Sequence, residues 1–237
     1  MQYGCAARAG RQWWPKSREV TVVRVFTAPD GTGGNLLGVL LGTADIADED
    51  CQAIAAELAY SETVFVDDVP TGRCRIFTPG VQLPFAGHPM VGLAWVLERQ
   101  GGTPAELRPP AGTVACWRDD DDWWVRAQAA WCPDWQLLEQ PSPAAVDDVE
   151  PPDTDVHEYR WAWADRARGE VRARAFASEV GIVEDEATGS AAIRLATLLQ
   201  ARVTIHQGRG SRLLATPFGA AEAGVGGTVA FEETRTI

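Results

Sequence analysis

The sequence predicts an α+β fold with two pseudo-symmetric domains, in each of which a curved, largely antiparallel sheet surrounds a central buried helix. Two stretches, residues 84–97 and 187–199, are apolar on nearly every face and begin with small residues. A helix that is apolar all round is buried in a domain, whereas a surface helix carries a one-sided apolar stripe. Segments rich in β-branched and aromatic residues precede both stretches, as expected for strands around them.

The two helical stretches align with each other as an internal repeat. Superposing Gly87 on Gly189 also pairs Leu93 with Leu195. A chain of 237 residues fits two domains of about 110–120 residues. Two unrelated core helices that share glycine, alanine and leucine explain the repeat equally well, so the repeat by itself leaves both interpretations open.

Composition and charge exclude several classes of partner. Apolar residues make up 46% of the chain, enough for packed cores. The net charge of −12 and the absence of a basic stripe argue against nucleic acid or an anionic membrane as a partner, and no apolar run is long enough to span a bilayer. The five cysteines are odd in number and widely spaced, which favours reduced thiols in a cytoplasmic protein without a metal site.

The first domain is expected over residues 19–112, after a loosely ordered extension over residues 1–18. The extension holds basic residues but lacks the apolar segment of a signal peptide. Residues 20–26 and 36–41 are predicted strands because β-branched and other apolar residues dominate them. The glycine-rich segment between them lacks a phosphate-binding motif and is predicted to be a loop.

A short helix and two strands lead into the first buried helix. The short helix is predicted from Glu49 to Ala59, with Asp48 as its N-cap. Residues 60–66 and 74–78 are the two strands, separated by a turn that contains proline and glycine. A glycine pair ends the buried helix.

The second domain is expected over residues 113–237, with the last strand able to return to the first domain. Residues 113–117 and 123–127 predict a hairpin around an aspartate-rich turn, which lacks the spacing and glycine of a calcium loop. The proline-rich, acidic segment 140–155 is expected to be a surface connection. Further strands are expected at residues 171–176, 203–206 and 228–231.

Four polar side chains stand at the ends of predicted elements: Glu62, His88, Asp185 and Ser190. Helix N-termini present free N–H groups and a positive dipole end, so the starts of both buried helices suit a carboxylate. Domains that face each other would place a carboxylate and an imidazole near such a substrate for proton transfer. Burial there would raise the pKa of Glu62 toward neutrality, as a general base requires.

The same residues also have interpretations without catalysis. Glu62 would be a solvated charge at the end of a strand. Asp185 would only interact favourably with the dipole of the following helix. His88 and Ser190 would each cap a helix. Arg209 and Arg212, in a basic, glycine-rich turn, fit an anion site or a plain surface turn equally well. The residue types by themselves leave these alternatives open.

Five sequence blocks carry a resemblance to a known family. They are residues 60–65 (YSETVF), 75–79 (RIFTP), 83–89 (LPFAGHP), 184–192 (EDEATGSAA) and 207–211 (QGRGS). The blocks lie in both halves, and the similarity runs from about Val20 to the C-terminus. On these blocks the chain resembles the PhzF family of phenazine-biosynthesis-like proteins.

The resemblance implies the diaminopimelate epimerase-like fold, with the active site between two similar domains, a homodimer and no cofactor. It also implies an isomerase in which a glutamate moves a proton between ring carbons of a small, carboxylate-bearing, amino-acid-like substrate in secondary metabolism. The family's best-understood substrate is 2,3-dihydro-3-hydroxyanthranilate. Two alternatives remain: an epimerase or tautomerase that uses the same glutamate, and a catalytically silent protein that binds a small molecule.

The family pattern assigns roles residue by residue. Glu62 matches the acid/base residue, and Gly189 lies at the carboxylate-binding helix start. The resemblance thus implies the catalytic residues Glu62, His88 and Asp185, and the substrate-binding residues Ser61, Gly87, Gly189 and Ser190. No metal ligand is expected.

Several positions depart from the family pattern. Ala86 and Glu186 stand near the places of two cysteines in related epimerases, so two-thiol racemisation is not expected. Gln82 replaces the usual Glu, Leu36 the usual Pro, and Glu186 the usual Pro. These changes leave the acid/base pattern intact but leave the substrate open. The tryptophans that suit either an altered cleft or the core are Trp131, Trp135, Trp161 and Trp163.

Overall fold

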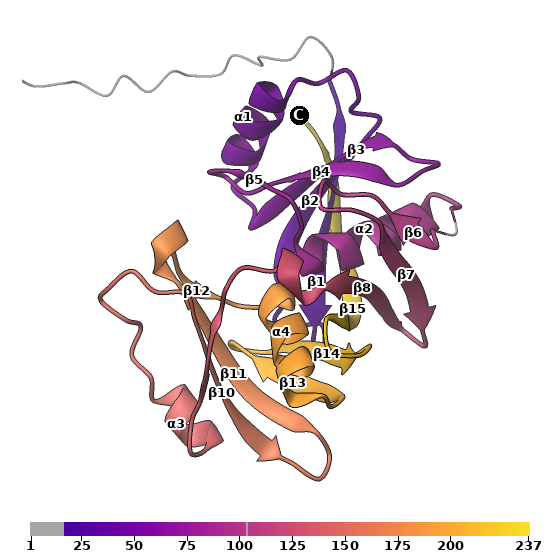
Figure 1. Cartoon of the computed structure of the whole chain (residues 1–237). Coiled ribbons are helices and arrows are strands. Elements are labelled where there is room, and N and C mark those ends of the chain that lie inside the picture. Colours follow the sequence, from indigo (N-terminus) through magenta and orange to yellow (C-terminus); the bar gives the residue numbers. More distant parts are fainter. Residues whose placement is uncertain (1–16, 103) are drawn as a thin grey trace, which may run out of the picture.

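The strands of the first half follow the β-branched segments of the sequence. The computed structural model describes residues 17–102 and 104–237 as an α+β fold (Figure 1). The strands of the first half are β1 (Glu19–Thr27), β2 (Asn35–Leu41), β3 (Glu62–Asp68), β4 (Arg73–Phe77) and β5 (Gln82–Leu83). β3 runs parallel to β2, whereas β1 with β2, β3 with β4 and β4 with β5 pair antiparallel. The four strands predicted here are confirmed, with shifts at their ends.

The ordered fold begins within the predicted N-terminal extension. Residues 1–16 of that extension lie outside the described residues, but Arg18 exchanges two main-chain hydrogen bonds with Ile237, at 3.0 and 2.9 Å. The Arg18 guanidinium also binds the Asp45 carboxylate at 2.7 Å. Residue 18 therefore continues the pairing of β1 with β15 beyond the ends of these strands.

Helix α1 (Asp48–Leu58) starts one residue before the predicted helix. Its N-cap is Ala47, and Asp48 is the first helical residue, so the prediction of Asp48 as N-cap is wrong. The Asp48 carboxylate binds Arg75 of β4 at 2.6 Å instead of a helix N–H group. A nearby guanidinium is a stronger partner for a carboxylate than a main-chain N–H, and only the fold brings it there.

Helix α2 (Gly87–Arg99) is the first buried helix. Every residue from Gly87 to Leu97 is buried, as the all-round apolarity predicts. Gly92 lets this helix lie close to the sheet, because a Cβ atom there would meet Leu37 Cδ2 at 2.5 Å and Val25 Cγ2 at 2.8 Å. The sheet of the first half thus packs closely on α2.

The second half repeats the design with more strands. The strands are β6 (Glu106–Leu107), β7 (Val114–Asp119), β8 (Asp122–Gln128), β9 (Gln136–Glu139), β10 (Glu158–Asp165), β11 (Glu170–Ala177), β12 (Ile182–Asp185), β13 (Val203–Gln207), β14 (Ser211–Pro217) and β15 (Glu222–Thr236). Two short 3₁₀ helices are η1 (Ala129–Trp131) and η2 (Ser178–Val180). β7 and β8 form the predicted hairpin. Five strands lie in segments for which no strand was predicted: β6, β9, β10, β12 and β14.

The segment 140–155 is more than an irregular connection. It contains helix α3 (Pro143–Asp147), whose N-cap Ser142 accepts a hydrogen bond from the Ala145 N–H at 3.2 Å. Val146 of this helix is fully buried. The helix packs on β10 and β11, but Val146 is the one buried residue among the described residues 140–155, so the surface connection is confirmed and contains a short helix. Five residues show too little periodicity to reveal such a helix in the sequence.

The long strand β15 joins the two halves. Its first part pairs with β8 and β14 of the second half, and its last part pairs with β1 of the first half. Figure 1 shows this yellow strand running from the lower half of the molecule into the upper half. The main path of the sheet has the order β5-β4-β3-β2-β1-β15-β14-β13-β11-β10-β9. The last strand therefore returns to the first half, as the sequence allowed.

Helix α4 (Gly189–Leu199) is the second buried helix, packed on β14 and β15. One large hydrophobic core contains residues of both helices and both halves, and a smaller core lies around α1. The domain boundary at residue 112 stays a prediction. Among the described helices, none is long and apolar enough to cross a membrane.

Candidate active site

The starts of α2 and α4 lie against each other through their glycines. A Cβ atom on Gly87 would lie 3.1 Å from the carbonyl carbon of Gly189, and one on Gly189 would lie 3.0 Å from the main-chain nitrogen of His88. Only glycine at both positions lets the backbones come this close. The two N-termini, each with N–H groups that lack an intrahelical partner, therefore meet at one place in the molecule.

Neither helix start is capped by a side chain among the described residues. The N-cap of α2 is Ala86 and that of α4 is Thr188, and neither donates or accepts a capping hydrogen bond through its side chain. The capping interpretation of His88 and Ser190 is therefore wrong. Uncapped and adjacent, the two starts form a place where an anion would meet several N–H donors and two positive dipole ends.

Glu62 and His88 face each other beside this place. Glu62 is the first residue of β3, where parallel pairing sets it next to Leu37 of β2. Its Oε2 lies 3.2 Å from Nε2 of His88, and the side chains are only 15% and 5% exposed. Neither atom has a hydrogen-bond partner within residues 17–102 and 104–237. Leaving a buried polar atom without a partner costs about 1–3 kcal/mol, so the pair is suited to a further partner.

Burial and nearby charge shift the pKa values of Glu62 and His88 in the directions that proton transfer needs. Burial raises the pKa of Glu62 well above its usual range, and the negative charge of Asp185 raises it further. Burial lowers the pKa of His88 to about 4, although Asp185 acts in the opposite direction. A neutral imidazole thus lies beside a carboxyl group that holds its proton more tightly than an exposed glutamate does.

Asp185 is held rigidly near the pair. It is the last residue of β12, and its Oδ1 accepts a hydrogen bond from Asn35 Nδ2 at 2.6 Å. Its Oδ2 accepts one from Thr188 Oγ1, also at 2.6 Å. Because both oxygens are engaged, Asp185 acts on Glu62 through its charge. Sequence reasoning missed Asn35 and Thr188, although an asparagine after a glycine-rich loop and a threonine before a buried helix were visible.

A buried amide extends this network to β10. Gln207 Nε2 donates to the Asp185 carbonyl oxygen and to Thr188 Oγ1, both at 2.8 Å. Gln207 Oε1 accepts from the Tyr159 hydroxyl at 3.0 Å and from the Thr188 N–H at 3.2 Å. Both the nitrogen and the oxygen of the Gln207 side-chain amide thus form hydrogen bonds to Thr188, the N-cap of α4. The network holds this helix start in one position.

Ser190 is oriented by a tryptophan. The Trp135 indole Nε1 donates to Ser190 Oγ at 3.0 Å. An indole nitrogen is only a donor, so the hydroxyl hydrogen of Ser190 remains free to donate elsewhere. Trp135 is buried and its ring centroid lies 3.9 Å from that of His157. Trp135 therefore lies both in the core and at the site, whereas Trp131, Trp161 and Trp163 pack in or against the core.

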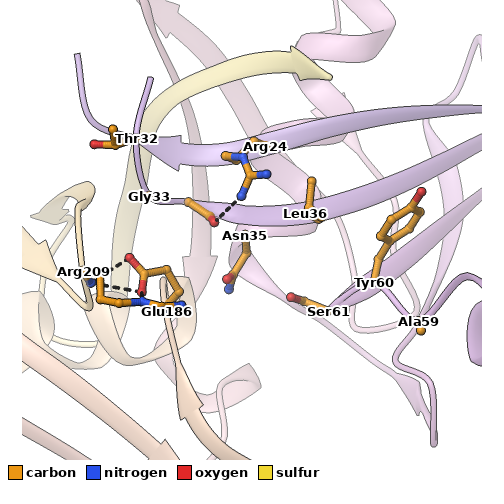
Figure 2. A pocket seen from close by; sticks show the side chains of 11 residues that line it. Arg24, Thr32, Gly33, Asn35, Leu36, Ala59, Tyr60, Ser61, Glu186 and Arg209 are labelled. Atoms are coloured by element: carbon orange, nitrogen blue, oxygen red, sulfur yellow. Dashed lines mark hydrogen bonds and ion pairs between the residues drawn. The ribbon is translucent and has the colours of Figure 1, made fainter. Parts of the chain in front are cut away.

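A pocket of about 520 Å³ adjoins these groups. Figure 2 shows Glu186 and Arg209 on one side of it, Ser61 and Tyr60 on the other, and Asn35 between. Glu62 and His88 do not line the pocket themselves. Their link to it runs through Ser61, next to Glu62 in the chain, and through Asn35, bonded to Asp185.

The structure thus brings the predicted residues into three contacting groups. Glu62 contacts His88, Gly87 contacts Gly189, and Asp185 contacts the start of α4. Ser190 lies on the same helix start, and Ser61 lies on the pocket. In the part of the chain that the structure describes, no group of three side chains could hold a metal ion.

Comparisons with known proteins find relatives that are named as isomerases. A family model described as phenazine biosynthesis-like protein matches residues 23–127. An isomerase of Pasteurella multocida is 41% identical over 99 residues, which cover 39% of this chain and 34% of that protein. The trans-2,3-dihydro-3-hydroxyanthranilate isomerase of Pseudomonas chlororaphis is 30% identical over 223 residues, which cover 76% of this chain and 80% of that protein. The first relatives are thus matched over about a third of their length.

Solved structures confirm the epimerase-like fold. A phenazine biosynthesis PhzC/PhzF protein from Clostridium difficile matches with a TM-score of 0.76 at 20% identity, over 93% of this chain and 99% of that one. A hydroxyproline epimerase from Agrobacterium vitis matches with a TM-score of 0.62 at 13% identity, over 94% of this chain and 93% of that one. At these identities the likeness concerns the fold alone.

Proposed function

Because the chain belongs to the PhzC/PhzF family of phenazine biosynthesis-like proteins, we propose that it is a cofactor-independent isomerase that moves a proton on a small carboxylate-bearing substrate. Relatives named as isomerases support this reaction class. Three relatives are named as isomerases of trans-2,3-dihydro-3-hydroxyanthranilate. The substrate of this chain would belong to the same broad class of small, cyclic, amino-acid-like carboxylates in secondary metabolism.

The contact between Glu62 and His88 is the observation that carries the proposal. Glu62 would take a proton from one carbon of the substrate and return it to another, so that the enzyme ends unchanged and nothing is oxidised. A raised pKa makes this two-way transfer efficient, because the best catalytic pKa lies near the working pH. His88, neutral and 3.2 Å away, would orient the carboxyl group and the substrate.

The adjoining helix starts would hold the substrate carboxylate. The N–H groups at Gly87 and Gly189 and the free hydrogen of the Ser190 hydroxyl are the donors that a carboxylate needs. Asp185 would make the ionised Glu62 carboxylate a stronger base for the substrate proton, since its negative charge adds to the effect of burial in raising the pKa of Glu62. Ser61 would contact the part of the substrate that reaches into the pocket.

The variant Glu62→Gln tests the proton carrier. It keeps the size of the side chain and should fold, but it cannot accept and return a proton. With trans-2,3-dihydro-3-hydroxyanthranilate as the probe, wild type should form product and incorporate solvent deuterium, whereas Glu62→Gln should lose at least about 10²-fold in rate. Glu57→Gln, on the exposed side of α1, is the matched control and should leave the rate unchanged.

The same assay separates the alternatives. An epimerase would return deuterium to the carbon that lost the proton and invert its configuration, and a tautomerase would move the proton between a carbon and an oxygen or nitrogen atom of the substrate. A protein that only binds the probe would show no exchange in wild type, and the isomerase proposal would then be wrong.

The proposal includes a homodimer, the state that the family resemblance implies. Size-exclusion chromatography with light scattering should give twice the chain mass of 25.6 kDa. A monomer at micromolar concentration would contradict this part of the proposal and leave the chemistry untouched.

A further inference from the structure

Glu186, the residue after Asp185, binds a loop of the second half. The loop, residues 208–210, connects β13 to β14, whose first residue is Ser211. Oε1 of Glu186 accepts hydrogen bonds from the main-chain N–H groups of Arg209 and Gly210, at 2.9 and 3.1 Å. It also accepts one from the Ser211 hydroxyl at 3.0 Å. The carboxylate is thus received by three donors that converge from the loop and the first residue of β14.

The loop has the form of an anion-binding nest. Gly208 has a φ of +57°, and a Cβ atom there would lie 2.4 Å from Oε2 of Glu186. Glycine therefore both permits the turn and leaves room for the carboxylate. Successive main-chain N–H groups that point into such a concavity bind anions.

A second hydrogen bond, from Gly34, orients the Ser211 hydroxyl as a donor to Glu186. The hydroxyl oxygen accepts a hydrogen bond from the Gly34 N–H at 2.7 Å, so its own hydrogen points to Glu186. Ser211 is only 1% exposed, and the loop is braced by Gly33, whose Cβ would meet the main chain of Gly210 and Ser211 at 2.4 Å. The donors are therefore held in place before any ligand arrives.

The occupied nest forms part of the pocket beside the candidate site. Glu186 and Arg209 line the pocket together with Asn35 and Ser61 (Figure 2). Arg209 is almost fully exposed, with its Nε 3.7 Å from Oε2 of Glu186. The pocket wall opposite Ser61 thus presents a carboxylate of the chain itself, set into donors that would otherwise receive an anionic ligand.

We propose that Glu186 determines specificity by filling this nest, so that the pocket takes substrates with a single acidic group and refuses a second carboxylate or phosphate at the far end. The proposal rests on the proposed function for the identity of the site. The first acidic group lies at the starts of α2 and α4, and the far end of the substrate carries no anionic group, because Glu186 already occupies the three donors that would bind one. Removing that carboxylate turns the loop into an open anion site.

The test measures anion binding to the nest by isothermal titration. Inorganic phosphate and acetate are the two probes, titrated separately into wild type, Glu186→Ala and Glu186→Gln. Glu186→Ala should bind phosphate at least about tenfold more tightly than wild type, since each hydrogen bond to a charged group strengthens binding by roughly that factor. Acetate should show a smaller gain because it has fewer acceptor oxygens. Glu186→Gln, which still fills the nest, should show neither gain.

A second substitution locates the new site. Adding Ser211→Ala to Glu186→Ala removes one of the three donors and should reverse most of the gain in phosphate affinity. Equal phosphate affinity in wild type and Glu186→Ala would overturn the proposal, and so would a gain that survives Ser211→Ala. If Glu186→Ala fails to fold, Glu186→Ser replaces it, and unfolding of both variants would assign Glu186 to loop stability alone and also overturn the proposal.

Binding and catalysis remain separable in these experiments. The titrations need no turnover, so they succeed or fail whatever Glu62 does. If the enzyme proposal holds as well, Glu186→Ala should raise the KM of a monocarboxylate substrate only slightly. It should also admit a substrate analogue with a second carboxylate, which wild type excludes.

Discussion

At the scale of single residues, the site is built around groups whose protonation the fold has changed. Glu62 and His88 lie in the same buried contact, yet burial acts on them in opposite senses, raising the pKa of the acid and lowering that of the base. Both shifts favour the neutral forms. A proton can therefore reside on Glu62 at a pH where an exposed glutamate would have lost it.

This shift predicts a pH-dependent gain of stability in Glu62→Gln. A carboxyl group with a raised pKa in the folded state favours folding below its ordinary pKa of about 4.5, and this contribution is lost as the pH rises through the folded value. Relative to wild type, Glu62→Gln should thus become progressively more stable as the pH rises above about 4.5, by about 1.4 kcal/mol per pH unit until the folded pKa is reached. Urea unfolding at several pH values measures this difference, and parallel curves for the two proteins would refute it.

His88 acts on stability at lower pH. Its folded pKa of about 4 lies below its ordinary value of 6.5, so the unfolded chain binds the proton first as the pH falls. His88 should therefore destabilise the fold progressively from pH 6.5 toward pH 4. His88→Asn should flatten the stability profile of the wild type in this range, as urea midpoints would show, and His206→Asn, on an exposed position of β13, should not.

At the scale of elements, the meeting of two helix starts determines the shape of the site. The glycines at the starts of α2 and α4 are needed because the backbones touch, and Asp185, Thr188 and Gln207 tie the start of α4 to β12 and β13. A helix that could shift by a few tenths of an ångström would misplace the donors of both N-termini.

Gly189→Ala is expected to separate the two helix starts. Its methyl group would meet backbone atoms of Gly87 and His88 at 3.0–3.1 Å, and such overpacking costs roughly 1–3 kcal/mol. Stability should fall by that amount, and substrate KM should rise more than kcat falls. Gly80→Ala is the control, because only Thr78 Oγ1 lies near its added methyl, at 4.0 Å. Equal behaviour of both variants in thermal unfolding and kinetics would contradict this account.

At the scale of the whole molecule, the two halves share a strand and a core. β15 pairs with β1 on one side and with β8 and β14 on the other, and the larger core takes residues from both halves. Neither half can bury its apolar face without the other. The site depends on this continuity, because its residues come from both halves.

Unfolding should therefore be a single transition for both halves. Val225→Ala, in the fully buried part of β15, removes apolar contacts worth about 2 kcal/mol. In native-state hydrogen exchange, the amides of β1 and of β13 should lose protection by the same amount. Loss confined to β13 and β14 would show instead that the halves unfold independently.

Much of the fold and of the candidate site could be predicted from the sequence. The buried helices follow from all-round apolarity, the strands of the first half from β-branched runs, and the candidate residues from the family resemblance of short motifs. α3 and β12 were missed because elements of four or five residues lack readable periodicity. The N-cap assigned to Asp48 was wrong because Arg75, distant in the chain, is the better partner.

The sequence by itself determined the two glycine-led buried helices, the family and the acid/base residue to test, because local patterns and motifs are written along the chain. Only the tertiary structure decided that Asn35 holds Asp185, that Trp135 orients Ser190 and that Glu186 fills the nest. Each of these contacts joins residues far apart in the chain. Such pairs meet only after strand register and helix packing have been settled, and no local pattern encodes them.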